Sequence, residues 1–251
     1  MQRSVVRPSP IFLGLIALTV AGGVLTGLDN EYQSAGTIAG TWLLVIGGWA
    51  VSLCLHEFGH AFTAFRGGDR EVYFKGYLTL DPRKYTDPVL SLFLPLLLLA
   101  AGGIPLPGGA VWINHYSLRS KGVESAVSLA GPAANLGLGI LITIAMALTN
   151  PAPMLAAALS YLALVQILAF VLNMLPIPGL DGWGALEPYL SHRARELGAK
   201  ARPWAPLVLF AVLIGIPGAS GVLFDVAGWV FEGIGGEPWW IVGYSNFMFW
   251  R

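Results

Sequence analysis

Six stretches of the chain are almost entirely apolar, and shorter stretches that carry most of the charge separate them. Each suits a helix that crosses a bilayer, which needs about 20 apolar residues at a rise of about 1.5 Å per residue. The sequence therefore predicts an all-α polytopic membrane protein. The six stretches are residues 11–28, 38–65, 88–104, 125–148, 154–175 and 205–226.

Composition and charge also favour a membrane protein. Of the 251 residues, 55% are hydrophobic and only 11% are charged, whereas soluble domains carry about 25% charged residues. Lysine plus arginine equals aspartate plus glutamate at 14 each, so the chain offers no excess positive charge to a nucleic acid. We therefore expect the lipid bilayer as its environment and no nucleic-acid partner. The pattern indicates no particular oligomeric state.

Charges at the ends of the apolar stretches predict how the chain is oriented in a cell membrane. Arg3 and Arg7 precede the first stretch, while Asp29 and Glu31 follow it. Because lysine and arginine are enriched on the cytoplasmic side, the N-terminus is expected there. The second stretch then runs inward and ends just before Arg66, so its last turns should lie on the cytoplasmic side.

We divide the chain into three parts. Residues 1–37 should form an N-terminal transmembrane helix and an external loop. Residues 38–190 form a membrane core that holds the polar motifs, and residues 191–251 form a C-terminal transmembrane helix with an interfacial aromatic tail. In the first part, Gly23 and Gly27 have the four-residue spacing that lets a second helix approach closely.

Residues 88–104 present a topological difficulty. They are apolar enough to span, but Arg119 and Lys121 follow, and the later stretches require that loop to be cytoplasmic as well. A re-entrant segment that enters and leaves on one side resolves this, and a plain spanning helix followed by a loop is the alternative. Short β-elements are expected nearby, a hairpin in residues 67–85 and a strand in residues 110–114.

The second apolar stretch contains the motif His56-Glu57-x-x-His60. Residues four apart share one face of a helix, so both imidazoles can reach a single metal ion. Glu57 lies beside them, where it can take a proton from water. Because ionisable groups at membrane depth cost several kcal/mol, a zinc site is favoured over histidines that only satisfy neighbouring carbonyl groups.

A hydrolytic zinc site has three protein ligands and one open position. Asp181 follows the fifth stretch and reaches the depth of His56 and His60 if the second and fifth stretches are antiparallel. It is therefore the expected third ligand of one zinc ion per chain, and an ordinary turn aspartate is the alternative. Asp87 and Glu187 compete for this role, but both lie beyond the apolar stretches, where solvation is favoured.

Two further groups are candidates for contact with a bound peptide. The amide of Asn135 lies in an apolar stretch and needs a hydrogen-bond partner, such as a group lining the metal site. A strand at residues 110–114 would leave an edge near Val111 with which an extended peptide can pair. We therefore place Asn135 and Val111 among the candidate substrate-binding residues.

Three polar motifs follow one another along the chain: His56-Glu57-x-x-His60, Gly131-Pro132-x-x-Asn135 and Asn173-x-x-Pro176-x-Pro178-x-Leu180-Asp181-Gly182. In order and spacing they resemble the site-2 protease family (peptidase M50) of intramembrane metalloproteases. The resemblance covers about residues 38–189 and points to compact members without a PDZ or CBS domain. One departure is Gly182-Trp183-Gly184, where many members have a Gly-Gly-Arg-type continuation. It leaves the implied ligands intact, so the resemblance carries over the metal site but not the shape of the pocket or the choice of substrate.

This resemblance implies a zinc-dependent endopeptidase that cuts in or near the transmembrane segments of membrane protein substrates. It implies His56, His60 and Asp181 as ligands, Glu57 as catalytic base and Asn173 near the bound peptide. The site should open toward the cytoplasm.

Two other functions are left open. One is a membrane metal transporter, although transporters tend to spread their ligands along a pathway, whereas these converge on one point. The other is an inactive relative that binds or chaperones membrane proteins, against which the intact motifs argue.

Overall fold

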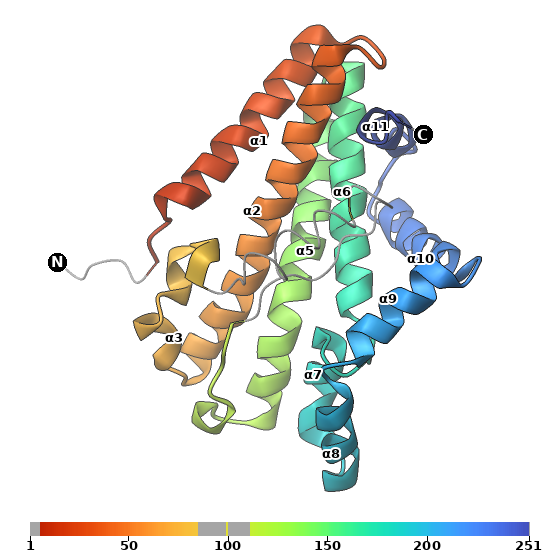
Figure 1. Cartoon of the computed structure of the whole chain (residues 1–251). Helices are drawn as coiled ribbons and strands as arrows, with labels where there is room; N and C mark the ends of the chain where they lie inside the picture. Colours follow the sequence, from red (N-terminus) through yellow and green to blue (C-terminus); the bar gives the residue numbers. More distant parts are fainter. Residues whose placement is uncertain (1–5, 85–98, 100–110, 251) are drawn as a thin grey trace, which may run out of the picture.

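The computed structural model describes residues 6–84, 99 and 111–250. These residues form α-helices and short 3-10 helices, and no β-strand occurs among them (Figure 1). Four of the helices are long and apolar enough to cross a membrane. They are α1 (Pro10–Asp29), α2 (Ala35–Gly67), α5 (Lys121–Thr149) and α6 (Pro153–Asn173).

These four helices confirm four of the predicted apolar stretches, and the bounds agree within a few residues. The hydroxyls of Ser34 and Ser120 cap the starts of α2 and α5 by accepting backbone N–H groups of the first turn. Asn30 and Asn150 end α1 and α5 in the left-handed conformation. Both turns lie at the same end of the bundle, because the Asn30 side chain accepts the N–H of Met154 at 3.0 Å.

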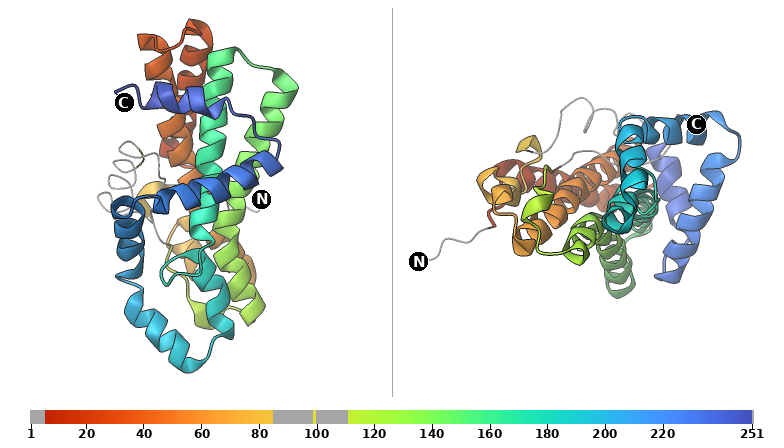
Figure 2. Two further views of the ribbon diagram at one scale, coloured as in Figure 1. Left: turned by 90° about the vertical axis from the view of Figure 1, so that its right-hand side faces the viewer. Right: turned by 90° about the horizontal axis from the view of Figure 1, so that it is seen from below.

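Helix α6 lies at the centre of the bundle. It contacts α1, α2 and α5, and it is the most deeply buried of the four long helices, while α1 is the least. Two shorter helices, α10 (Ala219–Gly233) and α11 (Trp240–Phe247), run across it rather than along it (Figure 2). A helix that is apolar on all sides must be shielded from water by protein or by lipid, and α6 is shielded mainly by the surrounding helices.

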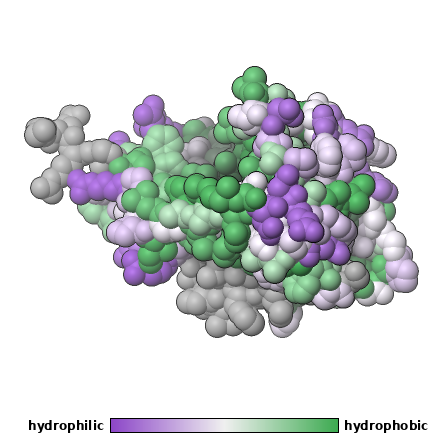
Figure 3. All heavy atoms as spheres, turned by 90° about the horizontal axis from the view of Figure 1, so that it is seen from above, coloured by the Kyte–Doolittle hydropathy of each residue, from purple (hydrophilic) through white to green (hydrophobic). Residues whose placement is uncertain are grey.

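The end of the bundle that carries the α1–α2 turn is seen in Figure 3. Apolar side chains cover much of the surface in this view, and polar ones are grouped between them. Exposed large apolar residues are also numerous along α1, among them Leu13, Val20 and Val24. Such a surface fits contact with lipid rather than with water.

Close packing of α1 on α2 depends on glycine. A Cβ added to Gly22 would collide with the backbone of α2, and one added to Gly40 would collide with a threonine hydroxyl of α1. The sequence predicted this role for Gly23 and Gly27, which is wrong by one position, because a Cβ at either would make only ordinary van der Waals contacts. Small residues allow two backbones to approach, but the contact face is set by the helix rotation.

The predicted β-hairpin in residues 67–85 is wrong for the part that the structure describes. Positive φ angles at Gly68, Gly76 and Leu80 turn the chain at short intervals and prevent an extended conformation. Val72, Tyr77 and Leu78 are instead buried against α2, whereas Phe74, another apolar residue of the expected hairpin, is 83% exposed. The elements here are α3 (Glu71–Phe74), η1 (Tyr77–Thr79) and η2 (Pro82–Lys84).

The predicted strand in residues 110–114 is not formed in its described part. Residues 111–114 belong to no helix and pair with no strand among the described residues. They lead into η4 (His115–Ser117). The segment 88–104, for which we predicted a re-entrant path, lies outside the described residues except for Leu99, which is helical and buried.

The sixth apolar stretch is not one helix. Pro217 and Gly218 interrupt it, and the positive φ of Gly218 turns the chain between α9 (Ala205–Gly215) and α10. Helix α9 is joined to α8 (His192–Ala201) at an angle of 61°. The count of six membrane segments is therefore not confirmed; the described residues give four, or five if α8 and α9 form one bent span.

Replacing Gly22 by alanine should destabilise the protein by about 1–3 kcal/mol, because the added methyl group overpacks the α1–α2 contact. Gly14→Ala is the matched control on the same helix, since a Cβ there meets nothing within 4 Å. Denaturant unfolding of both variants in detergent measures the difference. Equal stability of the two variants would contradict the packing described above.

Candidate metal centre

The motif His56-Glu57-x-x-His60 lies on α2, and all three side chains are buried. Both imidazoles face α5, where the two Nδ1 atoms find acceptors. His56 Nδ1 is 2.6 Å from Asn135 Oδ1, and His60 Nδ1 is 2.7 Å from the carbonyl oxygen of Val127. A carbonyl oxygen can only accept, so each Nδ1 carries the proton and donates it. Each Nε2 is then left with a lone pair, the form that binds a metal.

The two Nε2 atoms converge with the carboxylate of Asp181. They are 3.0 Å apart, Asp181 Oδ2 is 3.1 Å from His56 Nε2, and Asp181 Oδ1 is 3.4 Å from His60 Nε2. All three ligand atoms lie within 4.8 Å of one another. Asp181 Oδ2 is buried and accepts no hydrogen bond from any described residue. Lone pairs gathered this closely need a cation between them, and two imidazoles with one carboxylate are a donor set that suits zinc.

The sequence after α6 brings Asp181 to this point. Pro176 and Pro178 prevent the helix from continuing, and Gly179 turns the chain with a φ of 99°. Asp181 then begins α7 (Asp181–Leu186), which packs on α5. A Cβ at Gly182 would collide with the carbonyl of a residue just after α6, so glycine is required where the chain folds back.

Residues 111–114 lie against the motif. The N–H of Val111 donates to Glu57 Oε2 at 3.1 Å. The segment is fastened by the buried carboxylate of Asp69, which accepts the N–H of Asn114 at 2.8 Å and that of Glu71 at 2.9 Å. The backbone of this segment is therefore held beside the glutamate of the motif, although it is not the predicted strand.

A cavity of about 170 Å³ opens onto these groups. The three candidate ligands, Glu57, Val111 and Asn173 all line it. Of the competing ligands, Glu187 instead accepts a 2.7 Å hydrogen bond from Arg202, and Asp87 lies outside the described residues. Direct contact of substrate with Val111, Asn173 or Asn135 stays a prediction.

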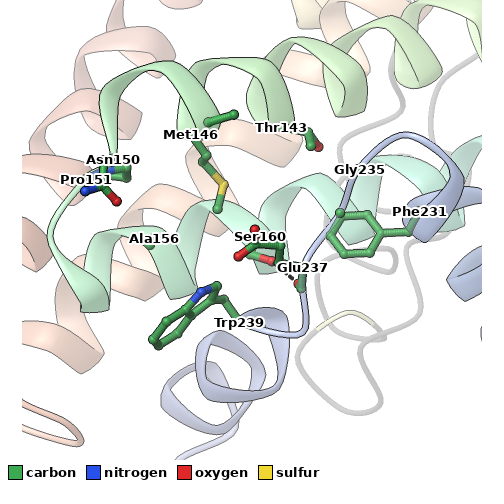
Figure 4. A pocket seen from close by; sticks show the side chains of 12 residues that line it. Thr143, Met146, Asn150, Pro151, Ala156, Ser160, Phe231, Gly235, Glu237 and Trp239 are labelled. Carbon is green, nitrogen blue, oxygen red and sulfur yellow. Dashed lines mark hydrogen bonds between the residues drawn. The ribbon is translucent and has the colours of Figure 1, made fainter.

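A larger cavity, of about 330 Å³, lies at the other end of the bundle (Figure 4). It is enclosed by α5, α6 and the segment that precedes α11, and Thr143, Ser160, Glu237 and Trp239 are among its lining residues. Among the described residues of this lining, Glu237 is the only acidic one, and none is a histidine. The volume of a cavity therefore does not identify the metal site in this protein, since the larger of these two cavities lies elsewhere.

Two residues that support the site were missed in the sequence. Gln166 of α6 accepts a hydrogen bond from Asn135, and Asp69 fastens residues 111–114. An amide inside an apolar stretch is a signal that could have found Gln166. Nothing in the sequence indicates that the main-chain carbonyl of Val127 contacts His60, because every residue has such a carbonyl.

A helical membrane chain with a buried cluster of two histidines and an aspartate beside a glutamate has the site of a membrane metallopeptidase. The chain is 50% identical over 233 residues to a Mycobacterium tuberculosis protein named "Putative zinc metalloprotease Rip2", covering 92% of this chain and 89% of that protein. A Mycolicibacterium smegmatis protein of the same name is 47% identical over 232 residues, with 92% and 89% covered. The chain belongs to the family of these relatives, the site-2 protease-like zinc metalloproteases.

A more distant relative shares the same class of name. The Bacillus subtilis protein "Putative zinc metalloprotease YwhC" is 30% identical over 189 residues, which are 70% of this chain and 82% of that protein. No family model matches the chain. No solved structure matches it either.

Replacing Gly131 by alanine should strongly weaken metal binding. A Cβ at this position of α5 would collide with His60 Nε2 and lie 2.5 Å from His56 Nε2, so it occupies the space in which the donor atoms meet. Gly137→Ala is the control on the same helix, since a Cβ there meets nothing within 4 Å. We expect zinc in the control and at most about a tenth as much in Gly131→Ala, because affinity falls when ligands are displaced. Elemental analysis of the purified variants decides this, and equal zinc in both would contradict the assigned position.

Proposed function

We propose that this chain is an intramembrane zinc endopeptidase of the site-2 protease (M50) type, which hydrolyses peptide bonds in or near the transmembrane segments of other membrane proteins. The observation that supports this most is the convergence of His56, His60 and Asp181 beside Glu57 within a bundle of apolar helices. The names of the relatives support the same chemistry.

The residues divide the chemical work between them. His56 and His60 would hold zinc through Nε2, and Asp181 would hold it through its carboxylate. When bound, zinc supplies a Lewis acid that polarises the scissile carbonyl and makes water more acidic. Glu57 lines the same cavity, so it can take a proton from the attacking water and return it to the leaving amine.

We propose that an extended peptide of the substrate binds beside residues 111–114. A helical substrate keeps its carbonyl groups in i to i−4 hydrogen bonds, so it must unwind locally before one of them can be attacked. Backbone pairing with the non-helical segment at Val111 would stabilise the unwound form. Asn173, which lines the cavity, is the second proposed contact.

The distribution of charge supports a multi-pass topology with the N-terminus and the opening of the site in the cytoplasm. Within the described residues, the lysines and arginines fall in four places. They lie before α1, in or after the last turn of α2, at or before the start of α5, and after α6. All four positions are at the end of the bundle that holds the metal centre. The α1–α2 and α5–α6 turns carry none, and lysine and arginine are enriched in cytoplasmic loops.

The depth of the site follows from the length of α2. His56 lies 21 residues after Ala35, the first residue of the helix. At about 1.5 Å per residue this is about 31 Å, close to the thickness of the hydrocarbon layer. The site is therefore proposed to lie near the cytoplasmic boundary, where water has a short path to it.

The metal-transporter alternative is not favoured. A transport path needs successive ligand groups, and His56, His60 and Asp181 are the only group of metal-binding side chains found in the described part of the chain. The base beside them also has no role in simple transport.

Replacing Glu57 by glutamine should lower cleavage by about 10²–10⁴-fold, because the general base is lost while the metal donors are kept. Glu196→Gln, a change at an exposed glutamate of α8, is the control. Quantitative proteomics of membranes from cells that express each variant should show fragments present with the control and absent with Glu57→Gln. A Glu57→Gln variant that still produces these fragments would remove Glu57 as the base.

A further inference from the structure

Gln166 is a buried amide in the middle of α6, and only 1% of the residue is exposed. Its neighbours along the helix are apolar. Burying an amide costs free energy unless it is hydrogen-bonded, so the contacts of this side chain show what it does.

A relay of hydrogen bonds joins Gln166 to the metal centre. Gln166 Oε1 accepts a hydrogen bond from Asn135 Nδ2 at 2.9 Å. The other end of the same amide, Asn135 Oδ1, is 2.6 Å from His56 Nδ1. Both residues are almost fully buried, so water does not compete for these contacts.

The direction of the Asn135 amide decides the state of His56. If the oxygen faces the imidazole, Nδ1 donates and Nε2 keeps the lone pair that a metal needs. If the amide were reversed, its N–H groups would face Nδ1, which would then have to accept, and the proton would sit on Nε2. A flipped amide would therefore take one donor away from the site.

We propose that Gln166 is a positioning residue of the metal centre, which fixes the direction of the Asn135 amide and through it the metal-binding tautomer of His56. The inference rests on the proposed zinc site but assigns a role to a residue outside it. His60 needs no such relay, because the carbonyl of Val127 can only accept. The two histidines are thus oriented by different groups. A backbone carbonyl of α5 orients His60, and the side chains of Asn135 on α5 and Gln166 on α6 orient His56.

Zinc affinity of the full-length protein in detergent, measured by competition with a chromogenic chelator, tests this. Gln166→Met has a similar length but a poor acceptor, and we expect its zinc affinity to fall about 10- to 100-fold. Gln166→Glu keeps an acceptor oxygen and should restore the affinity to within a few fold of the native protein. In Co²⁺-loaded protein, the visible absorption bands should change in Gln166→Met and return in Gln166→Glu.

A second background separates orientation from packing. In Asn135→Asp both side-chain oxygens accept, so His56 can donate whichever way the group is turned. There, Gln166→Met should no longer weaken zinc binding, which makes the two changes non-additive. If Gln166→Met only disturbed packing, it would lower the zinc affinity equally in the native protein and in Asn135→Asp, and that result would overturn the role of Gln166. Native zinc affinity in Gln166→Met would overturn it as well. If the native protein itself binds no zinc, the proposed function fails instead.

Discussion

Three atoms with lone pairs held together in a buried site are the constraint on which this structure depends. The Nε2 atoms of His56 and His60 are 3.0 Å apart, and Asp181 Oδ2 is 3.1 Å from the first. Three lone pairs held this close to one another are costly unless a cation lies between them. Each long helix of the core serves it: α2 carries the imidazoles, α5 supplies their acceptors and the space at Gly131, and the end of α6 directs Asp181 inward.

The fold could be predicted where length and hydropathy alone decide the structure. Four long helices follow from their apolar stretches, because a backbone in lipid must satisfy its own hydrogen bonds. The stretch at residues 205–226 is also mostly apolar, but Pro217 and Gly218 divide it into two helices. The overall apolar character of a stretch does not reveal such an interruption. The prediction of a hairpin in residues 67–85 was wrong because alternating polar and apolar residues also occur in a series of tight turns.

The site was predictable to the extent that its spacing is local. His56 and His60 share a helix face by geometry alone, and Asp181 required only that two helices run antiparallel. The groups that orient the imidazoles could not be derived in the same way. Val127 contributes a main-chain carbonyl, which any residue has, and the role of Gln166 depends on how α5 and α6 are rotated against each other.

X-ray absorption at the zinc edge of the purified protein, with zinc content measured in parallel for Asp181→Ala, tests the central claim most directly. We expect one zinc per native chain, with imidazole nitrogens at about 2.0–2.1 Å and an oxygen contribution. Asp181→Ala should lose most of its zinc. Full zinc loading of Asp181→Ala with an unchanged absorption spectrum would contradict the three-ligand site.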